Sequence, residues 1–159
     1  MRGLWFIVAR ALHVLAVVVW IGGVAAVTTV VLPTMRRLDS NEQKLWLFEQ
    51  VESRFRPQAR LAWLVVGLTG LYMLYALGAW GRFIDARYWW MHAMVALWVV
   101  FGLMLFIVEP LVVGPRLQRK LKSEPGKAVA RIEKLHWLLL VLSLCVISAA
   151  VAGAYGWLG

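Results

Sequence analysis

Three histidines carry most of the chemistry that this sequence offers. His13, His92 and His136 each lie in a different apolar segment of the chain. An imidazole is costly to bury in an apolar segment, so such a residue usually has a partner or a function. A neutral imidazole binds a transition metal or a haem iron through one ring nitrogen. The histidines therefore predict a metal or cofactor site.

Two of these histidines are expected at the same depth. His13 precedes Pro33 by 20 residues, and His92 precedes Pro110 by 18 residues. At ~1.5 Å rise per residue, both imidazoles lie ~30 Å from the helix ends that the prolines mark. In a four-helix bundle they can face each other as the two axial ligands of a b-type haem. The alternative is that they only form hydrogen bonds between helices or to water.

Arg10 and His136 extend this hypothesis in different ways. Arg10 precedes His13 by about one helical turn, so its guanidinium can pair with a haem propionate. His136 follows Lys134 at the opposite depth and cannot share the first site. We expect it either to bond to the backbone at the interface or to act as a proton or quinone contact. A third option is a ligand of a second metal or cofactor, with Met35 as its partner.

Copper is the competing metal. Met91, His92 and Met94 lie close together, and thioethers with imidazole suit Cu(I). Residues two apart do not share a helix face, however, so His92 and Met94 diverge. Cys145 is the only cysteine of the chain, which excludes an intramolecular disulfide and leaves its thiol as a further copper ligand.

The composition shows which elements must position these residues. Hydrophobic side chains make up 62% of the 159 residues and charged ones only 16%, whereas apolar residues make up about half of a soluble domain. The apolar residues form four blocks of roughly the ~20 residues that cross a bilayer. We therefore predict an all-α integral membrane four-helix bundle, as one domain over residues 1–159. The predicted spans are residues 4–32, 61–77, 88–108 and 135–157.

The ends of these spans follow from prolines and caps. Pro33 and Glu109-Pro110 are predicted to end the first and third spans, because proline cannot donate a helical hydrogen bond. Ser123 with Pro125 is predicted to start a helix that runs into the fourth span. The first span is longer than the apolar region of a cleaved signal peptide, so we expect it to remain in the mature protein.

The charges predict an orientation. Most of the basic residues behind the net charge of +9 lie in the first and third connectors. The positive-inside rule places these connectors in the cytoplasm and both termini on the outer, periplasmic side of a bacterial inner membrane. This explains the charge without nucleic-acid binding.

The first connector is predicted to contain an amphipathic helix over residues 41–55. Ser40 and Gln43 are spaced as a capping box. An apolar stripe with Trp46 then lies in the headgroup region or packs against the bundle. The stripe consists of Leu45, Phe48, Val51 and Phe55.

Three stretches of this chain resemble a known group of membrane proteins. Residues 10–23, RALHVLAVVVWIGG, resemble the first helix of CopD-like membrane proteins and of HemJ protoporphyrinogen oxidases. Residues 83–110, which contain WWMHAM, and residues 135–137, LHW, resemble copper-resistance-D-like four-helix proteins. The resemblance extends over nearly the whole chain.

The resemblance implies functions residue by residue. In HemJ-like proteins the first-helix histidine is associated with haem b, and His13 matches it. Their third helix has a lysine two residues after a histidine, where this chain has Met94. That departure argues against porphyrinogen oxidation and leaves His92 as the candidate second ligand. CopD proteins are implicated in copper handling, but this chain lacks a Met-rich or His-rich outer segment.

Three functions remain open from the sequence. The first is a b-type cytochrome with His13 and His92 as ligands, which passes electrons from a quinol to an outer-side redox partner. The second is a copper or small-solute carrier that uses Met91, His92 and Cys145. The third is a non-catalytic assembly subunit whose helix over residues 41–55 docks a partner. A homo-oligomer is compatible with each.

Overall fold

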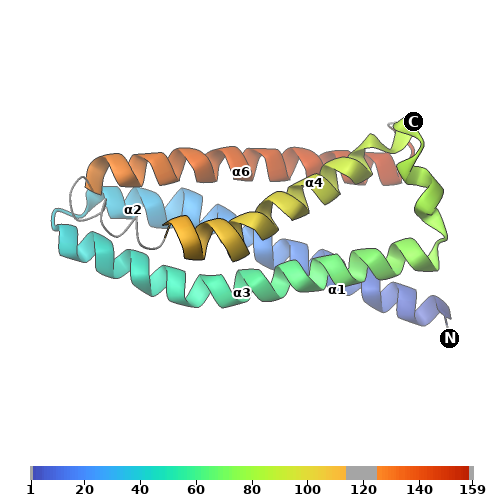
Figure 1. The fold of residues 1–159 in the computed structure, drawn as a ribbon, viewed down its shortest axis with the longest axis horizontal. Helices are drawn as coiled ribbons and strands as arrows, with labels where there is room; N and C mark the ends of the chain where they lie inside the picture. The colour runs from blue at the N-terminus through green and yellow to red at the C-terminus, as the bar shows by residue number, and fades with distance from the viewer. Residues whose placement is uncertain (1, 114–124, 158–159) are drawn as a thin grey trace.

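Four long helical rods make up the fold. The computed structural model describes residues 2–113 and 125–157, and each rod is long and apolar enough to cross a membrane (Figure 1). No strand occurs in these residues, so the predicted all-α membrane bundle is confirmed. The rods are α1 (Arg2–Ala26) with η1 (Val27–Val31) and α2 (Leu32–Arg37), then α3 (Asn41–Ala76), α4 (Trp89–Leu103) with η4 (Met104–Val113), and α6 (Pro125–Ala154). Two short 3-10 turns, η2 (Ala79–Phe83) and η3 (Ala86–Tyr88), join α3 to α4.

The prediction that Pro33 ends the first span was wrong, whereas the third candidate span ends at Pro110. The first rod continues past Pro33 to Arg37, and Pro110 lies inside η4. Both η1 and η4 are π-helical, and the amide of Leu32 bonds to the carbonyl of Val27. In a π-helical turn each amide bonds to the carbonyl five residues earlier, whereas in an α-helical turn it bonds to the carbonyl four residues earlier. A proline in a π-helical turn therefore leaves a different carbonyl without a donor. The fourth helix starts at Pro125 as predicted, while Ser123 lies outside the described residues.

The connector helix and the second span form one continuous helix. The helix predicted over residues 41–55 and the span predicted over residues 61–77 are not separate, because α3 runs unbroken through Pro57. Ser40 caps α3 as predicted, and its hydroxyl accepts a hydrogen bond from the Glu42 amide at 3.2 Å. Leu45 and Phe48 pack on a buried cluster that includes Met35. The apolar stripe therefore packs against the bundle.

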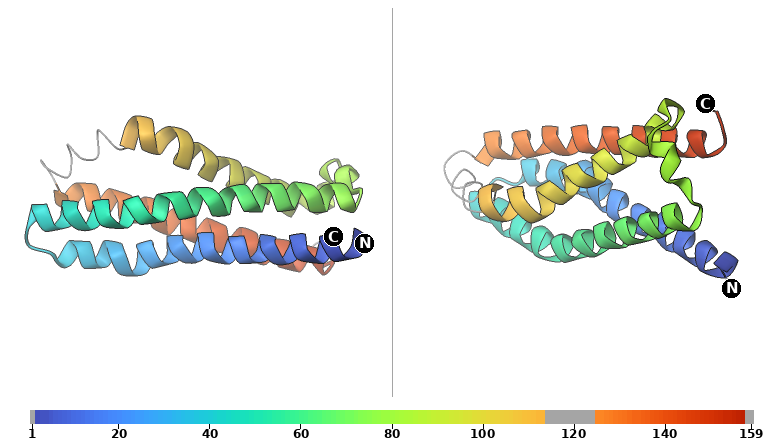
Figure 2. Two further views of the ribbon diagram at one scale, coloured as in Figure 1. Left: turned by 90° about the horizontal axis from the view of Figure 1, so that it is seen from below. Right: turned by 45° about the vertical axis from the view of Figure 1, so that its right-hand side comes forward.

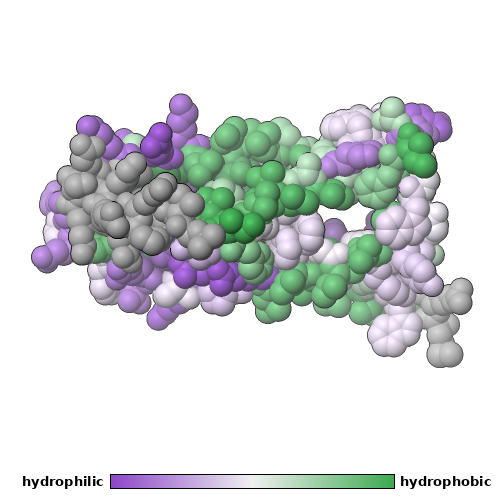
Figure 3. Space-filling view, in the orientation of Figure 1, coloured by the Kyte–Doolittle hydropathy of each residue, from purple (hydrophilic) through white to green (hydrophobic). Residues whose placement is uncertain are grey.

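The two termini lie at the same end of the bundle (Figure 1). We call it the termini end, and we call the opposite end, where α2 meets α3, the connector end. Figure 2 shows η4 diverging from α3 toward the connector end. The middle of the visible face is hydrophobic and the connector end is hydrophilic (Figure 3), as a bilayer requires. The cytoplasmic position of the connector end stays a prediction.

A reciprocal tryptophan pair joins α3 to α4. The indole N–H of Trp63 donates to the carbonyl of Trp98 at 2.8 Å, and Trp98 donates to the carbonyl of Trp63 at 3.0 Å. The two rings are stacked, with their centroids 4.1 Å apart. Each ring lies on a glycine of the other helix, and a Cβ on Gly67 or Gly102 would lie 2.6 or 2.5 Å from the opposing ring. The glycines therefore permit the contact.

Replacing Gly67 with alanine tests this contact. Alanine favours a helix over glycine by ~1 kcal/mol, but the added methyl group collides with Trp98, and overpacking costs ~1–3 kcal/mol. We expect Gly67→Ala to lower the thermal stability of the protein in detergent. Gly22→Ala is the matched control, since nothing lies within 4 Å of the Cβ that it adds. Equal stability changes in the two variants would contradict the proposed contact.

Candidate functional site

A large cavity lies in the termini-end half of the bundle, between α1, α3, α4 and α6. Its volume is about 900 Å³ and most of its lining is apolar. The space-filling surface is hollowed there between α4 and α3 (Figure 3). Within the membrane-spanning region, such an opening faces lipid. The cavity is therefore accessible to a molecule dissolved in the bilayer.

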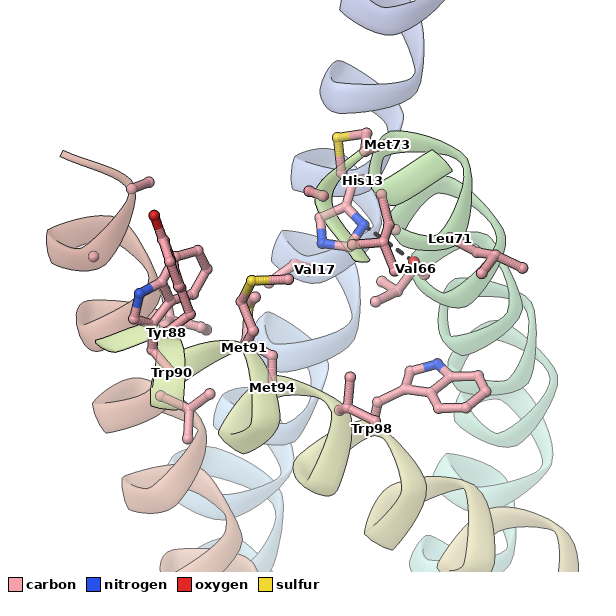
Figure 4. A pocket seen from close by; sticks show the side chains of 18 of the residues that line it. His13, Val17, Val66, Leu71, Met73, Tyr88, Trp90, Met91, Met94 and Trp98 are labelled. Atoms are coloured by element: carbon pink, nitrogen blue, oxygen red, sulfur yellow. Dashed lines mark hydrogen bonds between the residues drawn. The ribbon is translucent and has the colours of Figure 1, made fainter. Parts of the chain in front are cut away.

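His13 of α1 presents a free ring nitrogen to this cavity. Its Nδ1 lies 3.1 Å from the carbonyl oxygen of Val66 and 3.0 Å from the hydroxyl oxygen of Thr69, both on α3. A carbonyl only accepts hydrogen bonds, so Nδ1 carries the proton and donates. The unprotonated Nε2 then offers its lone pair to the cavity, and Figure 4 shows the second ring nitrogen on the side away from the hydrogen bonds.

The local sequence of α3 allows this arrangement. The hydroxyl of Thr69 donates to the carbonyl of Val65 at 2.5 Å, so its oxygen is oriented to accept from His13. A Cβ on Gly70 would lie 3.3 Å from Cε1 of His13, tighter than usual. The Thr-Gly pair thus supplies an acceptor beside the imidazole and the space for it.

Three methionines also line the cavity. Met73 comes from α3, and Met91 and Met94 come from α4 (Figure 4). Thioether sulfur is a soft ligand that suits Cu(I) and serves as an axial ligand of haem iron. Among residues 2–113 and 125–157 there is no group of three or more His, Cys, Asp or Glu that could hold a metal. Imidazole nitrogen and thioether sulfur are thus the donors that the cavity offers.

The charged groups of the lining are all basic. Arg10, Arg82 and Arg87 line the cavity, and no Asp or Glu is among the described lining residues. Arg87 is neutralised by Asp85, whose oxygen lies 2.6 Å from Nη2 of Arg87. The hydrogen bonds from Arg87 lower the pKa of the Asp85 carboxyl, so Asp85 stays ionised.

Two of these guanidinium groups have no carboxylate partner in the described residues. Arg82 lies over the Tyr88 ring at 5.2 Å, and Arg10 makes no ion pair there. Both side chains are exposed, and Arg82 lies in the η2 turn outside the candidate membrane spans. The positive charge of the lining favours an anionic occupant.

The structure brings together some of the predicted residues and not others. Arg10, His13, Met91 and Met94 line the cavity. His92 does not: it is exposed and packs edge-on against Phe83, with ring centroids 5.2 Å apart. On a helix, Met91 and Met94 share the face that points inward, whereas His92 is rotated by ~100° from Met91. The pairing of His13 with His92 stays a prediction that this placement does not favour.

Cys145 and His136 also lie away from the cavity lining. Cys145 is exposed on α6, so the predicted copper set of Met91, His92, Met94 and Cys145 is not assembled. The Nδ1 of His136 lies 3.0 Å from the carbonyl of Ile132. This contact agrees with a backbone-bonded interfacial histidine.

Sequence reasoning missed Met73 and Thr69. A pattern in the sequence could have indicated Met73. It is the spacing of Val66, Gly70, Met73 and Leu77, which recur after four, three and four residues and all line the cavity. This is the spacing of one helix face.

The chain matches one protein-family model. The family model described as "Copper resistance protein D" matches residues 49–153. These residues include the three cavity methionines, while His13 and Arg10 precede them. No curated protein and no solved structure matches the chain.

The orientation of His13 can be tested through Thr69. We expect ¹⁵N NMR of histidine-labelled protein to show His13 protonated at Nδ1 and bare at Nε2. Thr69→Val removes one of the two acceptors, which costs ~1 kcal/mol of stability and loosens the ring. Thr69→Ser keeps the hydroxyl and is expected to keep the wild-type signals. A proton on Nε2 in the wild-type protein would refute the assignment.

Proposed function

This chain belongs to the copper resistance protein D family of membrane proteins, and we propose that its cavity holds a b-type haem through His13. The observation that supports the proposal most is the combination of three features in one place. These are an imidazole nitrogen outside the hydrogen bonds to α3, an apolar volume of about 900 Å³, and two arginines, Arg10 and Arg82, without a carboxylate partner among residues 2–113 and 125–157. A haem requires an iron ligand, an apolar surround and cations for its propionates.

The residues of the cavity fit these requirements. His13 would hold the haem iron through Nε2. A thioether of α4, from Met91 or Met94, would be the second ligand in place of His92, and His/Met ligation raises the reduction potential of haem iron. Arg10 and Arg82 neutralise the propionates. The Trp90 and Trp98 rings in the lining exclude water and set a low local dielectric constant.

The role that follows is electron transfer in a bacterial inner membrane. A bound haem b supplies reversible one-electron chemistry. The opening of the cavity toward lipid favours a membrane-soluble reductant, such as a quinol, as the donor. Arg82 and Arg87 lie at the termini end, where an outer-side acceptor protein can approach.

Copper is the second candidate, and the methionines favour it. His13 with Met73, Met91 and Met94 forms a soft donor set for Cu(I) as transported cargo. The family description agrees with this reading. Against it, the arginines of the lining repel a bare cation, and among the described residues only Arg87 is compensated by a carboxylate. The charge of the lining therefore ranks haem first.

Histidine substitutions separate the haem proposal from the bis-histidine hypothesis. We expect the reduced-minus-oxidised spectrum of detergent-purified protein to show sharp b-type bands, which His13→Ala abolishes and His92→Ala retains. Arg10→Gln is expected to weaken haem retention roughly tenfold, because it removes a charge-assisted contact. Loss of the bands in both histidine variants would instead support His92 as the second ligand. A colourless protein after expression with adequate haem would rule out the haem proposal.

Metal analysis tests the copper candidate on the same preparations. If copper is the ligand, the haem-free protein is expected to bind one Cu(I) in competition with a chromogenic chelator. Met73→Leu is then expected to weaken that binding about tenfold or more while leaving the haem spectrum unchanged. Leu68→Ile, at an exposed position of the same helix outside the cavity lining, is the control. Unchanged Cu(I) affinity in Met73→Leu would remove Met73 from the donor set.

A further inference from the structure

A second apolar hollow lies on the opposite side of the tryptophan pair, between α3 and the α4–η4 rod. This groove has a volume of about 390 Å³, and its described lining is apolar apart from the indole nitrogen of Trp63, which is bonded to Trp98. Several side chains of its walls are more than two-fifths exposed, so the groove faces outward to lipid. They are Leu64, Val99, Leu103, Phe106 and Ile107.

Arg60 lies at the connector end of this groove. Its guanidinium lies 5.3 Å from the ring centre of Phe106, which lines the groove. Its Nη2 donates to the carbonyl of Leu105 at 3.0 Å. In a π-helix that carbonyl would accept from the residue five positions later, which is Pro110 and has no N–H. Arg60 therefore supplies the missing donor and is held in place by it.

The charge of Arg60 has no carboxylate partner in the described residues. The nearby acids are already paired with Arg56, which contacts Glu52 at 2.7 Å and also Glu109. The Nε of Arg60 is buried and has no hydrogen-bond partner in the part of the chain that the structure describes. A fixed cation thus stands at the end of an apolar groove, one helical turn from the paired Arg56.

We propose that the groove binds one anionic glycerophospholipid from the leaflet at the connector end. Its acyl chain lies along the groove, and its phosphate meets Arg60. The order of the residues along the rods supports this placement. From the connector end inward come Arg56 with Glu109, then Arg60 with Leu105, then Trp63 with Gly102. The cation is thus at the level of the headgroups and the groove at the level of the chains.

Native mass spectrometry of the full protein in detergent tests this site. The probes are phosphatidylglycerol and phosphatidylcholine with identical acyl chains. We expect the wild-type protein to retain phosphatidylglycerol about fivefold better, the contribution of one arginine near the surface. Arg60→Gln is expected to abolish this preference, and Arg60→Lys to restore most of it. Arg54→Gln removes an exposed charge from the same helix and is expected to keep the preference.

A variant in the wall of the groove tests the binding of the acyl chain separately from the binding of the phosphate. Leu103→Trp fills the groove from an exposed position and is expected to lower the retention of both lipids. Each variant is first checked for a wild-type thermal transition. Equal binding of the two lipids by the wild-type protein would overturn the proposal, as would equal losses in Arg54→Gln and Arg60→Gln. Displacement of the lipid by a quinone at equimolar concentration would assign the groove to the quinone instead.

Discussion

The contact between Trp63 and Trp98 lies between the two hollows of the bundle. Each indole must satisfy its N–H in a region without water, and each does so on the backbone of the opposite helix. The contact fixes α3 against α4 at the level of Gly67 and Gly102, and Arg60 and Arg56 join α3 to η4 farther toward the connector end. Toward the termini end the helices enclose the cavity, which Trp98 lines, and toward the connector end they leave the groove, which Trp63 lines. One pair of residues thus separates two sites.

The carboxylates that form ion pairs in the described residues leave several arginines without a counter-charge. Four acidic residues are paired with arginines: Glu52 and Glu109 with Arg56, Asp85 with Arg87, and Glu133 with Arg36. The arginines without a carboxylate partner in the described residues include Arg10 and Arg82 at the cavity and Arg60 at the groove. Both hollows therefore combine apolar walls with an uncompensated cation, which is the complement of an amphipathic anion.

The sequence predicted the depth of side chains along the helices better than the direction in which they point. Helical rise and apolar length placed His13 and Met91 in the same half of the membrane, and Ser40 correctly marked the start of α3. Which face of α4 points inward depends on the packing of Trp98 on Gly67, which lies 31 residues earlier in the chain. The helices also continue through Pro33 and Pro110, where the sequence pattern predicted helix ends, for a similar reason. A proline ends a helix only if the rest of the protein does not satisfy the freed carbonyl, and Arg60 does so for Leu105.

The cavity also limits what can occupy it. An apolar space that opens to the bilayer fills with acyl chains unless a better ligand is present. Acyl chains leave Nε2 of His13 without a hydrogen bond and Arg10 without a counter-charge, and each unmet polar group costs free energy in hydrocarbon. A ligand that satisfies both must carry a hydrogen-bond donor or an electron-pair acceptor, together with an acidic group on an apolar body. A haem b has these features, whereas a Cu(I) ion is only an electron-pair acceptor, and for this reason we propose haem before copper.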